Sequence, residues 1–164
     1  MRFHRLFSPL GFSGSLRDDG TLAAPDSSDR QVHAALSAVG AAPWVATLPD
    51  GLDTRVGAGE YPLTAAQVQQ LALARLVLRD PPVVVLDEAT AEAGSSGARD
   101  LEVAAAALIS GRTAIVVAHR LTQARACDRI AVLDDGLVVE FGTHDDLVAA
   151  HGRYAELWTA WSRR

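Results

Sequence analysis

Residues 83–90 read Val-Val-Val-Leu-Asp-Glu-Ala-Thr, and this stretch decides the fold of the chain. Four consecutive apolar residues predict a short strand that is buried on both faces. The strand delivers two adjacent carboxylates, Asp87 and Glu88, to its C-terminal end, where open α/β sheets bind their ligands. One carboxylate can orient Mg²⁺ and the other can polarise an attacking water. A strand that merely runs into a solvated turn has the same pattern, so the surrounding sequence must decide.

A helix precedes this strand and a second strand follows it. Thr64 and Gln67 form a capping box that begins a helix ending near Arg79. The residues at helical spacing that mark its inward face are Val68, Leu71, Ala72 and Leu78. Downstream, the apolar run 113–117 predicts a second buried strand, which is followed by His119. The two strand ends therefore carry acidic and imidazole groups.

The remaining segments complete an α/β pattern with a mixed sheet. We expect loops at residues 1–25, apart from one short strand, and at residues 91–97. Helices are expected at residues 28–40, 43–48, 98–110, 143 onward and 153–161. Strands 129–133 and 137–141 are expected to form a hairpin around Asp134-Asp135-Gly136. The glycines at 20, 57 and 59 are interpreted as turn residues.

The composition narrows the class of protein. The 164 residues carry a net charge of −5 with scattered arginines, which argues against a nucleic-acid partner. A single cysteine fits a reducing compartment, and no stretch approaches the length of a membrane span or a secretory signal, so we expect a soluble, cytoplasmic protein. All 15 basic residues are arginine. A Gly-x-x-x-x-Gly-Lys-Ser/Thr phosphate loop needs lysine, so this chain contains none.

Several further stretches occur in a fixed order along the chain. They are Phe12-Ser13-Gly14-Ser15-Leu16-Arg17-Asp18-Asp19, Leu48-Pro49-Asp50-Gly51-Leu52-Asp53-Thr54, Leu71-Ala72-Leu73-Ala74-Arg75, Asp80-Pro81-Pro82 leading into Asp87-Glu88-Ala89-Thr90, Ala118-His119-Arg120-Leu121, and Gly142-Thr143-His144-Asp145-Asp146-Leu147. In this order and spacing they resemble the nucleotide-binding domain of ATP-binding-cassette (ABC) transporters, most closely the exporter type. The resemblance begins near residue 10 and reaches the C-terminus.

The resemblance implies a partial P-loop NTPase fold, with parallel core strands, flanking helices, and a C-terminal hairpin with helices. Residues 1–164 would form a single truncated ATP-binding domain, with a helical and signature part at about 26–80 and a Walker B, switch-histidine and C-terminal part at 81–164. Asp87 would hold Mg²⁺, Glu88 would be the general base, and His119 would contact the γ-phosphate of ATP.

The segment Leu63-Thr64-Ala65-Ala66-Gln67 stands where the family has its signature motif, Leu-Ser-Gly-Gly-Gln. In the family this helix start caps the ATP bound to the opposite subunit. Thr64, Ala65, Ala66 and Gln67 would then contact nucleotide. Each alanine adds a Cβ where backbone must approach a phosphate, and a positive φ would be costly for Ala.

Other departures from the family pattern concern the phosphate loop and two polar positions. The phosphate loop and the aromatic residue that stacks on adenine are both missing. Phe7 stands near the place of a metal-coordinating glutamine, and residues 91–94, Ala-Glu-Ala-Gly, replace the loop whose aspartate bridges the dimer.

These features predict a fragment of the ATPase subunit of an ABC exporter, using ATP and Mg²⁺ but inactive alone. Its partners would be a second ABC ATPase domain and transmembrane domains from another chain or a missing N-terminal part. One alternative is a non-catalytic docking or capping partner of another ABC ATPase. A further alternative, a split ATPase head of the chromosome-maintenance type, is disfavoured because no heptad run precedes Leu63.

Overall fold

A computed structural model describes residues 14–22, 24–57, 60–87, 95–118 and 120–163. The chain divides into two compact units, one ending at Val116 and the other beginning at Val117. The architecture is mixed α/β with small two-stranded sheets. None of the helices in the described ranges has the length and hydropathy of a transmembrane span.

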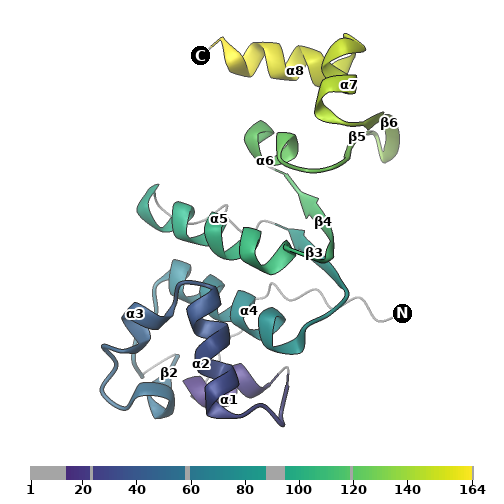
Figure 1. Ribbon diagram of the computed structural model, residues 1–164. Helices are drawn as coiled ribbons and strands as arrows, with labels where there is room; N and C mark the ends of the chain where they lie inside the picture. Colours follow the sequence, from purple (N-terminus) through teal and green to yellow (C-terminus); the bar gives the residue numbers. More distant parts are fainter. Residues whose placement is uncertain (1–13, 23, 58–59, 88–94, 119, 164) are drawn as a thin grey trace. The chain divides into compact units, whose positions relative to one another are not determined.

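The first unit consists mainly of helices around one apolar core. In chain order its elements are β1 (Gly14–Ser15), α1 (Leu16–Thr21), α2 (Asp29–Ala38), α3 (Ala42–Val45), the 3-10 helix η1 (Gly51–Asp53), β2 (Arg55–Val56), α4 (Ala65–Arg79), β3 (Val83–Asp87), α5 (Ser95–Ile109) and β4 (Thr113–Val117), whose last residue opens the second unit. β1 pairs with β2 in antiparallel fashion. Figure 1 shows α1, α2 and α4 gathered together, in agreement with their mutual contacts.

Helix α1 lies where the sequence predicted loop. Ser15 caps it: the Ser15 hydroxyl accepts a hydrogen bond from Asp18 N at 3.1 Å, and the Asp18 carboxylate accepts one from Ser15 N at 3.0 Å. This capping box is hidden in a stretch rich in Gly, Ser and Asp, which explains the wrong prediction. Gly20 is helical rather than a turn residue, and a Cβ there would lie 3.3 Å from Val32.

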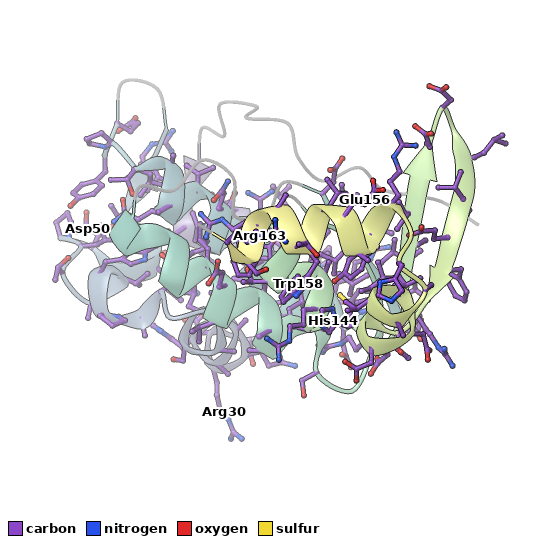
Figure 2. All side chains as sticks on the ribbon, turned by 90° about the horizontal axis from the view of Figure 1, so that it is seen from above. Arg30, Asp50, His144, Glu156, Trp158 and Arg163 are labelled. Atoms are coloured by element: carbon purple, nitrogen blue, oxygen red, sulfur yellow. The ribbon has the colours of Figure 1, made fainter. Side chains whose placement is uncertain are left out.

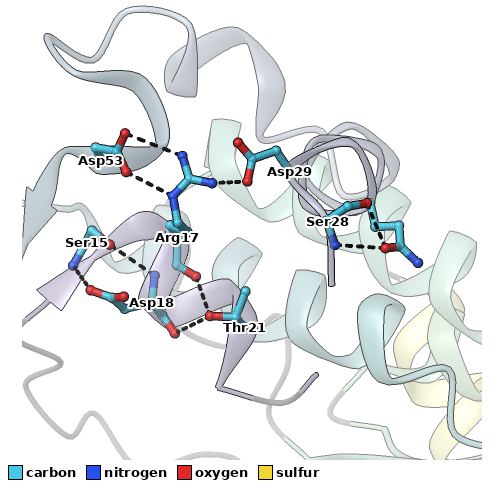
Figure 3. A network of polar contacts seen from close by, with 8 residues as sticks. Ser15, Arg17, Asp18, Thr21, Ser28, Asp29 and Asp53 are labelled. Atoms are coloured by element: carbon cyan, nitrogen blue, oxygen red, sulfur yellow. Dashed lines mark hydrogen bonds and ion pairs between the residues drawn. The ribbon is translucent and has the colours of Figure 1, made fainter. Parts of the chain in front are cut away.

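Arg17 ties α1 to two neighbouring elements (Figure 3). Its Nε donates to Asp53 of η1 at 2.9 Å, and its guanidinium also pairs with Asp29 at the start of α2. The Arg17 side chain is half-buried and both aspartates are exposed to water, so this network aligns the elements more than it stabilises them.

The helices α2 and α4 confirm two predictions. Gln31 reaches back to the N–H of Ser28 at 2.9 Å, and Gly40, with φ of +70°, follows the end of α2 in the left-handed region. On α4 the inward face includes Leu71 and Ala72 as expected, but Val68 is 41% exposed. Helix α5 begins at Ser95, so residues 95–97 are helical and not loop.

Strand β3 is covered on one side only, and the prediction of burial on both faces is wrong. Val84 and Leu86 are each 2% exposed, whereas Val83 and Val85 are 45% and 47% exposed. The second predicted strand, β4, also alternates, and its Ile115 is 57% exposed. A run of apolar residues cannot distinguish a strand covered on one face from a strand covered on both.

The second unit is a hairpin with helices. Its elements are α6 (Leu121–Arg125), β5 (Ile130–Asp134), β6 (Leu137–Gly142), α7 (His144–Ala149) and α8 (Arg153–Ser162). The predicted turn is confirmed: Asp135 and Gly136 have φ of 46° and 78°, as a two-residue hairpin turn requires. The helix α6 was not predicted.

Tyr154 of α8 anchors the core of the second unit. It is 2% exposed and packs with Ile130 and Leu147. Its hydroxyl lies 2.9 Å from Nδ1 of His144, whose ring meets Trp158 edge-on at 4.5 Å between centroids (Figure 2). The hairpin, α7 and α8 are thereby joined into one body.

Candidate functional site

Asp87 is the last residue of β3 and lies half-buried. Side chains alternate along a strand, so Asp87 shares the side of the exposed Val83 and Val85, not the side of the buried Val84 and Leu86. Among the described residues, none forms a hydrogen bond or ion pair with its carboxylate. The structure thus presents an acidic group at the carboxyl end of a strand, as the sequence predicted.

The strands β3 and β4 are hydrogen-bonded neighbours. Thr113 N, at the start of β4, donates to Pro82 O, just before β3, at 3.3 Å. Both strands are five residues long, and their first residues lie side by side. Glu88 follows β3 directly and His119 follows β4 by two residues; both lie outside the described residues, as do Phe7 and 91–94.

The start of α4 carries the other group of predicted site residues. The Thr64 hydroxyl accepts from Gln67 N at 3.2 Å, and Gln67 Oε1 accepts from Thr64 N at 2.8 Å. This reciprocal pair satisfies two of the amide groups that a helix start leaves open. The N–H groups of Ala65 and Ala66 have no acceptor among the described residues, as is usual in the first turn of a helix.

The backbone strain expected at the two alanines is absent. Both belong to regular helix after an extended Thr64, with φ of −70° and ψ of 159°. The described non-glycine residues with positive φ are Asp80, Asp135 and His151. The two alanines therefore differ from the family's glycines only in the space that each Cβ occupies. The Cβ of Ala66 packs against the core, and the Cβ of Ala65 is exposed.

Two buried polar contacts hold α4 in place. Arg75 donates to both carboxylate oxygens of Asp19 in α1, at 3.1 and 2.7 Å. Gln70, 5% exposed, accepts from Trp44 Nε1 at 2.9 Å and donates to Val39 O at 3.2 Å. Sequence reasoning missed both contacts. Arg75 and Gln70 interrupt the apolar face of α4, and this interruption in the sequence indicates polar contacts on the buried side of the helix.

Burial raises the pKa of the Asp19 carboxyl, and the Arg75 guanidinium opposes that rise. Asp19 is 1% exposed, so its carboxylate stays ionised only because the Arg75 guanidinium lies beside it. This pair fixes the direction of α4, and with it the position of the Thr64 end.

The chemistry of the Asp87 carboxylate suits an Mg²⁺ ion. Mg²⁺ is commonly held by one or two carboxylates together with phosphate oxygens. Asp87 offers one carboxylate, and within the described ranges no group of three His, Cys, Asp or Glu side chains forms a complete metal site.

Comparison with known proteins gives these features a context. No protein-family model matches the chain. It is 46% identical over 127 residues to an ATP-dependent lipid A-core flippase of Burkholderia orbicola, covering 77% of this chain and 21% of the flippase. It is 43% identical over 152 residues to a multidrug efflux ATP-binding/permease protein of Mycobacterium bovis, covering 93% of this chain and 13% of that protein. A solved bacterial Atm1-family ABC exporter with ATP bound superposes with a TM-score of 0.79 at 34% identity, over 92% of this chain and 26% of the exporter chain.

The chain belongs to the ABC exporter family. It spans 13% to 26% of the length of these three relatives. The resemblance drawn from the sequence motifs is thereby confirmed.

Proposed function

We propose that this chain is the C-terminal part of the ATP-binding domain of an ABC exporter, residues 1–164 forming one truncated domain with a P-loop NTPase core. The observation that carries the proposal is the match of nearly the whole chain to an exporter with ATP bound. The pairing of β3 with β4 and the capping box at the start of α4 agree with it.

Each predicted site residue then has a task. Asp87 holds Mg²⁺, which supplies positive charge to the phosphates when bound. Glu88 orients the attacking water as general base, and His119 contacts the γ-phosphate of the same nucleotide. Thr64, Ala65, Ala66 and Gln67 cap the ATP held by a second ABC ATPase domain, through the amides of the helix start.

The partners follow from these tasks. A second ATPase domain supplies the nucleotide that α4 caps. Both ATPase domains lie at the cytoplasmic face of the membrane, and transmembrane domains couple ATP binding and hydrolysis to export. The chain contains no lysine, so it has no phosphate loop of its own, and we expect it to show negligible ATPase activity alone.

A chimera tests the proposal. In the Burkholderia orbicola flippase, the segment similar to this chain is replaced by this chain, and ATP hydrolysis is measured in reconstituted vesicles. We expect hydrolysis that falls by about 100-fold or more with Glu88→Gln, since general-base catalysis contributes that much. Glu156→Gln makes the same chemical change on the exposed side of α8 and leaves the rate unchanged.

Two outcomes would count against this function. Substantial turnover by the isolated chain would show that it needs no phosphate loop from elsewhere. A chimera that hydrolyses ATP equally well with Glu88→Gln would leave only the non-catalytic capping function, which the intact geometry at Thr64 favours as the second candidate.

A further inference from the structure

We propose that Gln70 is a positioning residue for nucleotide capping: its contacts with Trp44 and Val39 hold the Thr64 end of α4 where that end meets ATP. This inference rests on the proposed function and adds to it a residue that acts without touching the nucleotide. All four residues belong to the first unit, in which α2 contacts both α3 and α4.

The start of α4 has few packing contacts of its own. Thr64 and Ala65 are exposed, Val68 is 41% exposed, and Ala66 is only half-buried. Gln70 is the first buried residue of the helix, six positions after Thr64 and so about 9 Å along the axis. The direction of the capping end is therefore set by the contacts that begin at Gln70.

Gln70 pairs two polar groups that belong to other elements. Its Oε1 accepts from Trp44 Nε1 of α3 at 2.9 Å, and its Nε2 donates to Val39 O, just after α2, at 3.2 Å. The residue four positions after Val39 is Pro43, which has no N–H, so a continued helix would leave this carbonyl unpaired. An indole N–H also needs a partner when it is buried. Because hydrogen bonds weaken steeply with misalignment, an amide that serves one donor and one acceptor admits few positions of α4.

Gln70 and Arg75 hold α4 from different sides. Five positions separate them, which places their side chains about 140° apart around the helix. Gln70 reaches α3 and the end of α2, whereas Arg75 reaches Asp19 of α1. Together the two contacts oppose rotation of α4 about its axis. Gln70 is the nearer of the two to Thr64, so its loss should move the capping end more.

The direction of the capping end can be measured in the full chain by NMR. Gln70→Met removes both hydrogen bonds and keeps a side chain of similar length. We expect it to change the residual dipolar couplings of the Ala65 and Ala66 amides relative to those of α2. Gln69→Met is the matched control, because Gln69 adjoins Gln70 on α4 and its side-chain oxygen has no hydrogen-bond partner among the described residues. Its couplings should equal those of the parent chain.

ATP affinity gives a second measurement, made in the chimera described above. Glu88→Gln is added as the background so that hydrolysis does not disturb binding. Gln70→Met should raise the Kd for ATP about tenfold, the loss expected for one hydrogen bond to a charged group, and Gln69→Met should leave the Kd unchanged. A merely structural role would lower the number of ATP sites per molecule and leave the Kd of the remaining sites unchanged.

Trp44→Phe tests whether Gln70 acts through the indole. It removes the N–H that Gln70 accepts and should also raise the Kd for ATP. Combined with Gln70→Met it should add little, because the two residues share one contact. Fully additive effects would show that the indole has no part in the positioning contact.

Three results would overturn the positioning role: unchanged couplings of Ala65 and Ala66 in Gln70→Met, an unchanged Kd in the same variant, or equal effects of Gln69→Met. If the Kd is unchanged while Glu88→Gln still abolishes hydrolysis by the chimera, the positioning role fails and the proposed function stands. A chimera that binds no ATP would count against the proposed function, whereas changed couplings would still support the control of the capping end by Gln70.

Discussion

Arg75 of α4 holds the carboxylate of Asp19 of α1 with two hydrogen bonds, although the two residues are 56 positions apart. Asp19 is 1% exposed, and the Arg75 side chain is 20% exposed. The pair is therefore a buried, bidentate contact between the helix that begins at Thr64 and the first helix of the chain.

Arg75→Ala should lower the free energy of unfolding by about 3–5 kcal/mol, because it leaves the Asp19 carboxylate buried without a partner. Arg79→Ala removes an exposed arginine from the same helix and should have little effect. Urea denaturation followed by circular dichroism compares the two variants. Equal losses would show that the ion pair has no special role, and Asp19→Leu added to Arg75→Ala should recover part of the loss.

Thr64→Ala should lower stability by about 1 kcal/mol, since Gln67 N loses its acceptor at the start of α4. Thr159→Ala alters an exposed threonine within α8 and serves as the control. Thermal denaturation measures both. Thr64→Ser keeps the hydroxyl and should behave like the parent chain; a loss as large as that of Thr64→Ala would place the cause outside the capping box.

The capping box of α7 should make stability depend on pH. The hydroxyl and then the backbone N–H of Thr143 lower the pKa of Asp146 below its ordinary value of 3.8. A lowered pKa in the folded state gives stability that is present above 3.8 and is lost as the pH falls through the lowered value. Asp146→Asn should remove this part of the pH dependence and Asp145→Asn should retain it, as measured by denaturation at a series of pH values.

Tyr154→Phe should destabilise the second unit by about 1 kcal/mol, because the His144 ring nitrogen loses its partner inside the core. Tyr61→Phe changes a tyrosine that is 39% exposed and should have no measurable effect. The NMR signals of the His144 ring report the lost contact directly. An unchanged ring environment would show that the hydrogen bond does not form in solution.

The sequence predicted those elements whose signals are local. The capping residues and apolar spacing located α2 and α4, and Asp135-Gly136 located the hairpin turn, because each signal lies within a few residues of what it specifies. It also placed Asp87 at a strand end and Thr64 at a helix start. The loop predicted at 95–97 and the missed α1 show that boundaries and short helices depend on packing as well.

The features that the sequence did not reveal are set by tertiary contacts. Nothing near Asp19 indicates that Arg75 lies beside it, because the pairing depends on how α1 packs against α4. The exposure of Val85 depends on which layers cover β3, and four successive apolar residues carry no information about that.

The alternation of inward-facing and outward-facing residues along β3 has a consequence for the evolution of the chain. Asp87 points away from the core only because it lies four positions after the outward-facing Val83 and two positions after Val85. Inserting or deleting one residue within β3 would exchange the two sides of the strand and turn the carboxylate into the apolar interior. Substitutions at the exposed Val83 and Val85 leave this alternation intact, whereas a change in the length of the segment reverses it.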